Sequence, residues 1–148
     1  MTTAKSNFRQ VDGFEQLYVA RSGALSCIAF ALKTGDLCLY SPVARLAKTE
    51  CAVPADLGAV SLIFASNHYH NKGLKPYVEL FPDATLVCSD QAKPRLRKQT
   101  GLDFASMDMV SAALPENMKL LQPEGLKTGE VWLQVQQDGR RAWAVTDA

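Results

Sequence analysis

The fold is decided by the stretch Gly58–Pro82, which reads GAVSLIFASNHYHNKGLKPYVELFP. Its first part, Val60–Ala65, is a short apolar run rich in branched and aromatic residues, which predicts a strand buried on both faces. In its last part, from Leu74 to Phe81, apolar residues recur at i, i+3, i+4 and i+7. This spacing indicates an amphipathic helix. The stretch therefore predicts a strand, a polar junction and a helix.

The polar junction, Ser66–Gly73, contains both histidines of the chain, His68 and His70. In open α/β sheets, ligands usually bind in the crevice beyond the carboxyl ends of the strands. This junction is therefore where we expect chemistry.

The segments on either side of this unit extend the sheet. Two apolar runs within Ala24–Tyr40 flank a turn with Gly and Asp, which predicts a β-hairpin. An Asp138-Gly139 turn predicts a second hairpin near the end of the chain. Further strands are predicted at Phe14–Ala20, Ala84–Cys88, Met118–Leu121, Glu130–Gln136 and Arg141–Thr146. Helices are predicted at Ala44–Ala52 and Gln91–Thr100, whereas residues 102–113 show no clear pattern and residues 1–13 are expected to be loosely held.

Composition limits the classes of protein to consider. A chain of 148 residues is most simply one domain, 1–148. The net charge of +1 argues neither for nor against a nucleic-acid or anionic-membrane partner, and no apolar window approaches ~18 residues. We expect no nucleic-acid and no membrane partner. Basic residues gather in Gln91–Thr100, where we expect a solvated helix face. No secretory signal is visible, and four scattered cysteines are typical of buried thiols in a reducing compartment. A cytoplasmic location is therefore predicted.

The order of these elements resembles the N-terminal half of the metallo-β-lactamase fold. More narrowly, the runs GDLCLYSPV, ASNHYHN and FPDATL resemble a divergent, uncharacterised branch of that superfamily. The resemblance covers about Ala24–Ala148. It implies an α/β fold with a metallo-β-lactamase-like β-sheet and flanking helices. Because the chain stops directly after its last predicted strand, we expect either an incomplete copy of the fold or an edge strand at that position.

The same resemblance implies a metal site. In the family, the strand that corresponds to Val60–Ala65 ends in an H-x-H-x-D-H motif of zinc ligands, and a later strand ends in a bridging aspartate. Carried over to this chain, the implied metal ligands are His68, His70 and Asp147. Zinc is the implied metal, although iron and manganese suit the same ligands. The neighbouring Tyr69, Asn71 and Lys72 are the implied substrate contacts, with Lys72 suited to an anionic substrate.

The chain also departs from the family motif. Lys72 stands where the motif has aspartate, and Gly73 stands where it has a further histidine. In the turn Pro123–Glu130, Leu126 takes the place of another histidine. The resemblance therefore implies a divergent metal-dependent hydrolase with a depleted site, acting on a small-molecule substrate, with its catalytic residues unknown. The alternatives are a non-catalytic scaffold or binding protein that has lost the metal, or a fragment of a longer hydrolase.

The last predicted strand also bears on assembly. If Arg141–Thr146 lies at the edge of a sheet, its unpaired backbone groups can pair with another chain. Self-association through this strand is therefore expected.

Overall fold

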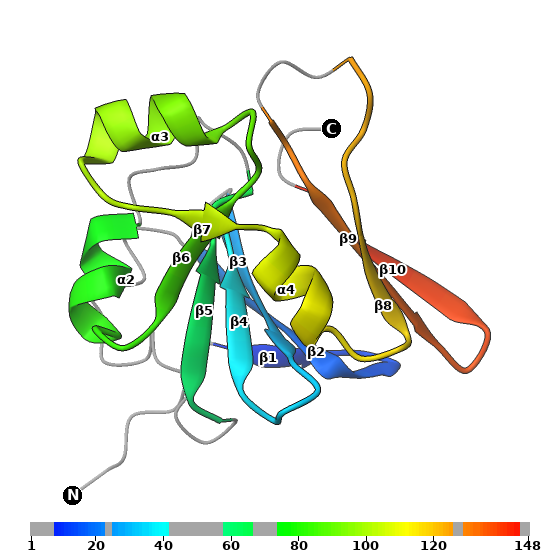
Figure 1. Ribbon diagram of the computed structural model, residues 1–148. Helices are drawn as coiled ribbons and strands as arrows, with labels where there is room; N and C mark the ends of the chain where they lie inside the picture. The colour runs from blue at the N-terminus through cyan, green and yellow to red at the C-terminus, as the bar shows by residue number, and fades with distance from the viewer. Residues whose placement is uncertain (1–7, 23–24, 42–57, 67–73, 126–128, 146–148) are drawn as a thin grey trace, which may run out of the picture.

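A computed structural model describes the protein over residues 8–22, 25–41, 58–66, 74–125 and 129–145. Within these ranges the chain has a mixed α/β architecture, with a seven-stranded sheet, a three-stranded sheet and a few short helices (Figure 1). The predicted α/β class is therefore confirmed. The helices in these ranges are too short and too polar to cross a lipid bilayer.

The larger sheet is mixed, and its strands lie side by side in the order of the chain. Its first four strands are antiparallel, and from the fourth strand onward neighbours are parallel. The strands are β1 (Arg9–Val11), β2 (Phe14–Ser22), β3 (Leu25–Ala31), β4 (Leu37–Tyr40), β5 (Val60–Phe64), β6 (Thr85–Cys88) and β7 (Ala105–Ser106). The parallel part places the carboxyl ends of β4, β5 and β6 along one edge.

Within Gly58–Pro82 the strand and the helix form as predicted, whereas residues 67–73 between them lie outside the described residues. β5 lies between β4 and β6, and Ile63 and Phe64 on its opposite faces are both fully buried. The helix that follows is α2 (Leu74–Leu80), whose Leu74 and Tyr77 are also fully buried. The continuous apolar run thus predicted the strand, and the helical spacing of the apolar residues predicted the buried face of the helix. The predicted β3–β4 hairpin is likewise confirmed.

The seven-stranded sheet has a hydrophobic core on each face. On one face, α2 and α3 (Lys93–Thr100) pack over residues such as Leu39 and Ile63. On the other face, α4 (Asp108–Ala113) and the smaller sheet pack over residues such as Phe64 and Val87. Figure 1 shows this arrangement, with α2 and α3 on one side of the large sheet and α4 and β8–β10 on the other. The molecule is therefore layered, and the large sheet is covered on both faces.

The smaller sheet is antiparallel and has the order β10-β9-β8. Its strands are β8 (Met118–Leu121), β9 (Trp132–Gln137) and β10 (Arg140–Ala144). Asp138 and Gly139 connect β9 to β10 with φ values of 51° and 78°. Two successive positive φ values are typical of the type I′ hairpin turn, so the predicted hairpin is confirmed.

Three elements were not predicted from the sequence. We expected residues 1–13 to be loosely held, but residues 8–13 are ordered: Arg9–Val11 pair with β2, and Phe8 is buried. The two-residue strand β7 and the six-residue helix α4 lie in the segment that showed no clear pattern. Both are too short for a period of two or of 3.6 residues to become visible. The predicted helix Ala44–Ala52 lies outside the described residues.

The described cysteines behave as predicted from their spacing. Cys27, Cys38 and Cys88 are free thiols, and each is buried. Burial raises the pKa of the Cys38 thiol well above its ordinary value, with a smaller contribution from Cys27. Burial also raises the pKa of Cys88 to about 11. Cys38 and Cys88 are therefore protonated at neutral pH, and all three buried cysteines pack as small apolar groups.

Candidate functional site

A serine follows the carboxyl end of each of β4, β5 and β6, directly after β4 and β6 and one residue further on after β5. The residues in question are Ser41, Ser66 and Ser89, and all three are buried. The hydrogen bonding between β4 and β5 continues past the end of β4, because the Ser41 amide donates a hydrogen bond to the Phe64 carbonyl at 3.0 Å. Ligands of open α/β sheets usually bind beyond such ends. The edge is therefore the candidate site.

A three-residue segment, Gly129–Val131, runs across this edge, and we call it the crossing segment. The Ser89 hydroxyl donates to the Gly129 carbonyl at 2.6 Å, which joins the segment to the end of β6. The Val131 amide donates to the Ser66 carbonyl at 2.9 Å, which joins it to the end of β5. The Tyr40 hydroxyl donates to the Val131 carbonyl at 2.6 Å, which joins it to the end of β4. The crossing segment thus contacts three neighbouring strand ends in succession.

The close approach of this segment to β6 and α3 depends on Gly129. Its φ is +70°, a conformation that side chains other than glycine rarely adopt. A Cβ at this position would lie 2.5 Å from the Ala92 amide nitrogen and 2.7 Å from Ser89 Oγ. Glycine is therefore required here by both the backbone conformation and the space available.

Tyr40 links the same edge to the end of β10. Its hydroxyl lies 3.3 Å from the Ala144 carbonyl as well as 2.6 Å from that of Val131. The ring is fully buried and stacks on Phe64, with the ring centroids 5.8 Å apart and the planes 9° from parallel. This packing fixes the position of the hydroxyl. The carboxyl end of β10 therefore lies beside the carboxyl ends of β4 and β5.

The site residues implied by the family resemblance all lie outside the described residues. These are His68, Tyr69, His70, Asn71, Lys72 and Asp147. The described residues that flank them do come together. Ser66, two residues before His68, is joined through Val131 and Tyr40 to Ala144, which stands three residues before Asp147. The segments that carry the implied ligands therefore begin at the same edge of the sheet.

Glu130, in the middle of the crossing segment, is a candidate site residue that the sequence analysis did not single out. It is 1% exposed, and its Oε2 accepts a hydrogen bond from the indole nitrogen of Trp132 at 2.5 Å. The sequence places Glu130 in phase with Trp132 and Gln134, on the side of β9 opposite to Val131, Leu133 and Val135 of the core. Alternation alone therefore predicts an exposed position. In the structure the carboxylate is instead buried and bound by Trp132, and Gln134 in the same phase is also buried.

The ligands implied by the resemblance, His68, His70 and Asp147, are two imidazoles and a carboxylate. Imidazole and carboxylate groups are ordinary zinc ligands. Within the described residues themselves, no three His, Cys, Asp or Glu side chains are grouped closely enough to hold a metal ion. A metal at this edge would therefore need ligands from outside the described residues.

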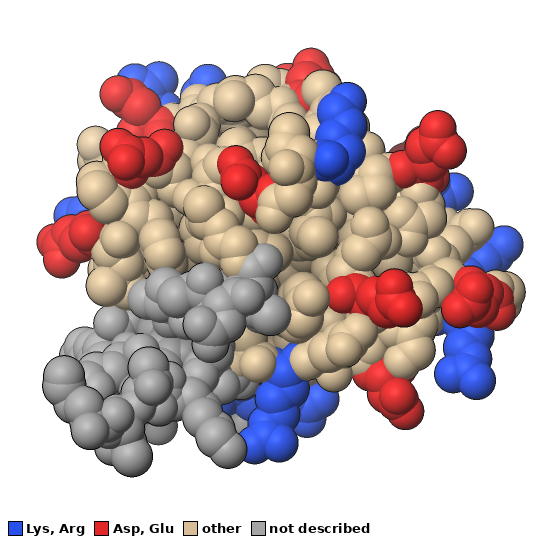
Figure 2. Space-filling model, turned by 90° about the horizontal axis from the view of Figure 1, so that it is seen from below, with Lys and Arg blue, Asp and Glu red and all other residues tan. Residues whose placement is uncertain are grey.

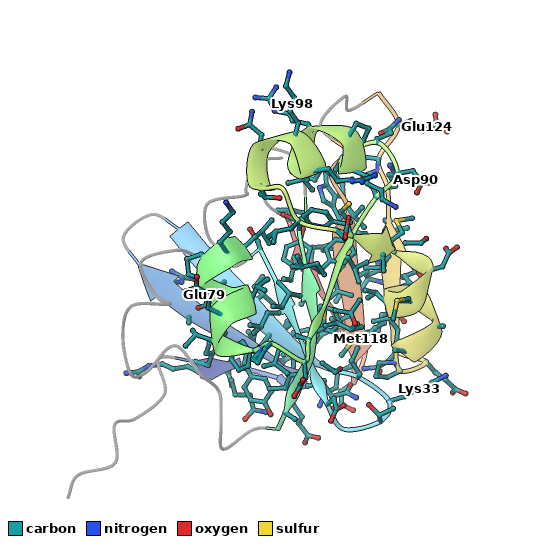
Figure 3. The ribbon with its side chains drawn as sticks, turned by 60° about the vertical axis from the view of Figure 1, so that its left-hand side comes forward. Lys33, Glu79, Asp90, Lys98, Met118 and Glu124 are labelled. Atoms are coloured by element: carbon teal, nitrogen blue, oxygen red, sulfur yellow. The ribbon has the colours of Figure 1, made fainter. Side chains whose placement is uncertain are left out.

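A surface cleft lies at the carboxyl ends of β6 and β7, apart from the candidate site. It has a volume of about 340 Å³, and its rim includes the carboxylates Asp90, Asp108 and Glu124. Figure 3 shows Asp90 and Glu124 near each other beside the start of α3. The Gln122 amide donates to the Gln91 side-chain oxygen at 3.3 Å and joins the two sides of this cleft. It is open to solvent and separate from the crossing segment's contacts with β4 and β5.

Charges of both signs are interspersed on the surface. Figure 2 shows acidic and basic side chains alternating over the face seen from below. On α3, Arg95, Arg97 and Lys98 are exposed, and Arg97 pairs loosely with Asp103 at 3.7 Å. An exposed pair at this distance contributes little to stability. The basic residues of α3 thus form a solvated face, as the sequence analysis expected.

Comparison with protein-family models and with curated proteins gave no match for this chain. The geometry of the edge formed by β4, β5, β6 and the crossing segment is therefore the basis for a functional argument.

Proposed function

We propose that this chain is a divergent, metallo-β-lactamase-like hydrolase with a reduced metal site, and that it acts on a small-molecule substrate. One observation carries the proposal. Ser66 and Ala144, from distant parts of the sequence, are joined by hydrogen bonds through Val131 and Tyr40. The layered mixed α/β architecture also suits the family resemblance.

The proposed ligands are within reach of this edge. An extended chain spans at most about 3.3–3.6 Å per residue, so His68 lies within roughly 7 Å of Ser66, and Asp147 within roughly 11 Å of Ala144. In an extended junction, residues i and i+2 share a face, which suits His68 and His70 as a pair of ligands. The proposed metal set is therefore His68, His70 and Asp147.

The proposed metal is zinc, with iron or manganese as alternatives that suit the same donors. Such a metal would act as a Lewis acid on a carbonyl or phosphoryl oxygen of the substrate. In this proposal Tyr69 and Asn71 position the substrate, and Lys72 attracts an anionic group. Glu130 adds a buried carboxylate at the same edge, and a negative charge there favours retention of a cation.

The alternative is a non-catalytic scaffold or binding protein. A specific observation favours it, because the crossing segment is held by Ser89, Ser66 and Tyr40 without any implied metal ligand. The strand ends are thus joined by protein groups alone, and the fold does not require a metal to connect them. The replacement of the motif's aspartate by Lys72 and of a histidine by Leu126 points in the same direction.

Elemental analysis of the purified protein separates the two proposals. The hydrolase proposal predicts about one equivalent of zinc, iron or manganese, with loss of the metal in the His68→Ala/His70→Ala double variant. The control is Gln99→Ala, which changes an exposed polar residue of α3. A metal-free protein, with the double variant equally stable, would support the scaffold and exclude the hydrolase.

A further inference from the structure

β10 forms one border of the smaller sheet. Within the described residues it pairs with β9 alone, in the order β10-β9-β8. Arg140, Arg141 and Trp143 are exposed, and 48% of the Trp143 surface is accessible. An exposed edge strand presents unpaired N–H and C=O groups, which can pair with another strand.

The hydrogen bonds of Gln136 show which backbone groups of β10 face this edge. The Gln136 amide donates to the Asn117 carbonyl, and the Asn117 side-chain amide donates to the Gln136 carbonyl, both at 2.8 Å. Both backbone groups of Gln136 therefore point toward the β8 side. Arg141 lies opposite Gln136, so this is a non-hydrogen-bonded pair of the β9–β10 ladder. The N–H and C=O of Arg141, and by the period of two those of Trp143, consequently point to the outer edge.

We propose that two copies of this chain pair antiparallel along β10, with Ala142 opposite Ala142 of the second copy. In this register Arg141 of each copy lies opposite Trp143 of the other. Such opposed residues exchange both N–H···O=C bonds, and these are the residues whose backbone groups face outward. The two three-stranded sheets then become one continuous sheet across the two-fold axis.

The side chains favour this register over its neighbours. Arg141 and Trp143 lie on the same face of β10, so the pairing sets each guanidinium beside the indole of the other copy, where a cation–π interaction is favourable. Trp143 is held edge-on against Trp132, with the ring centroids 6.4 Å apart, so its ring is already oriented. A shift of the second copy by two residues in one direction sets Arg141 opposite Arg141, which is destabilising. A shift in the other direction sets Trp143 opposite Trp143 and Arg141 opposite Val145, which loses both cation–π contacts.

Two substitutions of Arg141 test the use of the outer edge. Arg141→Pro removes the outward N–H at a position where an edge strand tolerates proline, and its matched control Arg141→Ala removes the same charge but keeps the N–H. In sedimentation velocity we expect a dimer for the wild type, a weaker dimer for Arg141→Ala and a monomer with wild-type circular dichroism for Arg141→Pro. A wild type that is monomeric across a wide concentration range, or a folded Arg141→Pro variant that stays dimeric, would overturn the proposal.

Disulfide trapping tests the register without disturbing the backbone. In a Cys51→Ser background the remaining cysteines are buried, so Ala142→Cys introduces one new thiol per chain, at a partly buried position of β10. Residues in a non-hydrogen-bonded pair have their Cα atoms about 4.5 Å apart, which a disulfide can bridge. We expect mild oxidation to cross-link Ala142→Cys efficiently. Trp143→Cys should react poorly, because diagonal neighbours lie about 7–8 Å apart. Preferential cross-linking of Trp143→Cys would overturn this register. The pairing does not involve the proposed metal ligands, so either proposal can be wrong without affecting the other.

Discussion

The Val131 amide donates a hydrogen bond to the carbonyl oxygen of Ser66 at 2.9 Å, which joins the start of β9 to the end of β5. The two residues are far apart in the sequence, and Ser66 is the first residue of the junction that carries both histidines. The Ser89 and Tyr40 hydroxyls bind the carbonyls on either side of this contact. The crossing segment thus organises the edge of the sheet where we place the function.

Replacement of Tyr40 by phenylalanine tests the connection between the crossing segment and β10. The substitution removes the hydrogen bonds to the Val131 and Ala144 carbonyls. Because both carbonyls lose a buried donor, we expect a loss of about 1–3 kcal/mol in the free energy of unfolding, measured in urea. Tyr18→Phe is the matched control, since Tyr18 is only partly buried on β2. Equal stability of the two variants would show that the Tyr40 hydroxyl does not tie these strands together.

Gly129→Ala tests the close approach of the crossing segment to the end of β6. The added Cβ would lie within 3 Å of the Ala92 nitrogen and Ser89 Oγ, at a φ of +70°. We expect destabilisation by more than about 2 kcal/mol, because the segment must move away from Ser89.

The control for this variant is Gly125→Ala, which has a similar φ of +82° but meets nothing within 4 Å. It isolates the cost of the backbone conformation, which we expect to be about 1 kcal/mol. Similar losses for both variants in chemical unfolding would contradict the proposed steric requirement at Gly129.

Tyr77→Phe is expected not to lower the stability of the protein, in contrast to Tyr40→Phe. The Tyr77 hydroxyl is buried and has no hydrogen-bond partner within the described residues. Burial, with a smaller effect of Cys27, raises the pKa of this hydroxyl well above its ordinary value. Because an unsatisfied buried hydroxyl is costly, its removal should stabilise the protein by about 1 kcal/mol or leave it unchanged. A clear loss of thermal stability in Tyr77→Phe would refute this interpretation.

The fold follows from the sequence wherever the pattern is local. The stripe Leu74, Tyr77 and Phe81 specified α2, and Asp138-Gly139 specified the last hairpin. The strand β7 could not be predicted in this way, because its two residues are too few to show alternation.

The candidate site was predictable only in part, for the same physical reason. The position of the junction follows from the apolar run before it and the helical period after it. The crossing segment depends on contacts between residues distant in the sequence, such as that of Ser89 with Gly129. Neither residue carries a local signal of the other. The burial of Glu130 was likewise not predicted, because an alternating strand pattern favours an exposed carboxylate at this position.

Alkaline pH should destabilise the protein through its buried thiols. The pKa of Cys88 is raised to about 11, chiefly by burial, with Lys93 lowering it and Asp90 raising it further. In the unfolded chain this thiol ionises near its ordinary pKa of about 9, so above that pH the unfolded state binds fewer protons than the folded state. The free energy of unfolding should therefore fall as the pH rises from about 9 to about 11 and be unaffected by this group below that range.

The variant Cys88→Ala checks this pH dependence. Urea unfolding at pH 7.5 and pH 10.5 should show a smaller difference in stability for the variant than for the wild type. A variant with the same alkaline loss as the wild type would show that ionisation of Cys88 makes no contribution, and would assign the loss to other groups.

The central claim is that the junction after Ser66 and the residues after β10 contribute ligands to one metal ion. Isothermal titration of zinc into metal-free protein tests it most directly, with Asp147→Asn compared with the wild type. Removal of a carboxylate ligand should weaken zinc binding at least about tenfold, a change of about 1.4 kcal/mol, while the fold is retained. Undiminished zinc affinity in Asp147→Asn, or no saturable binding in the wild type, would contradict the claim.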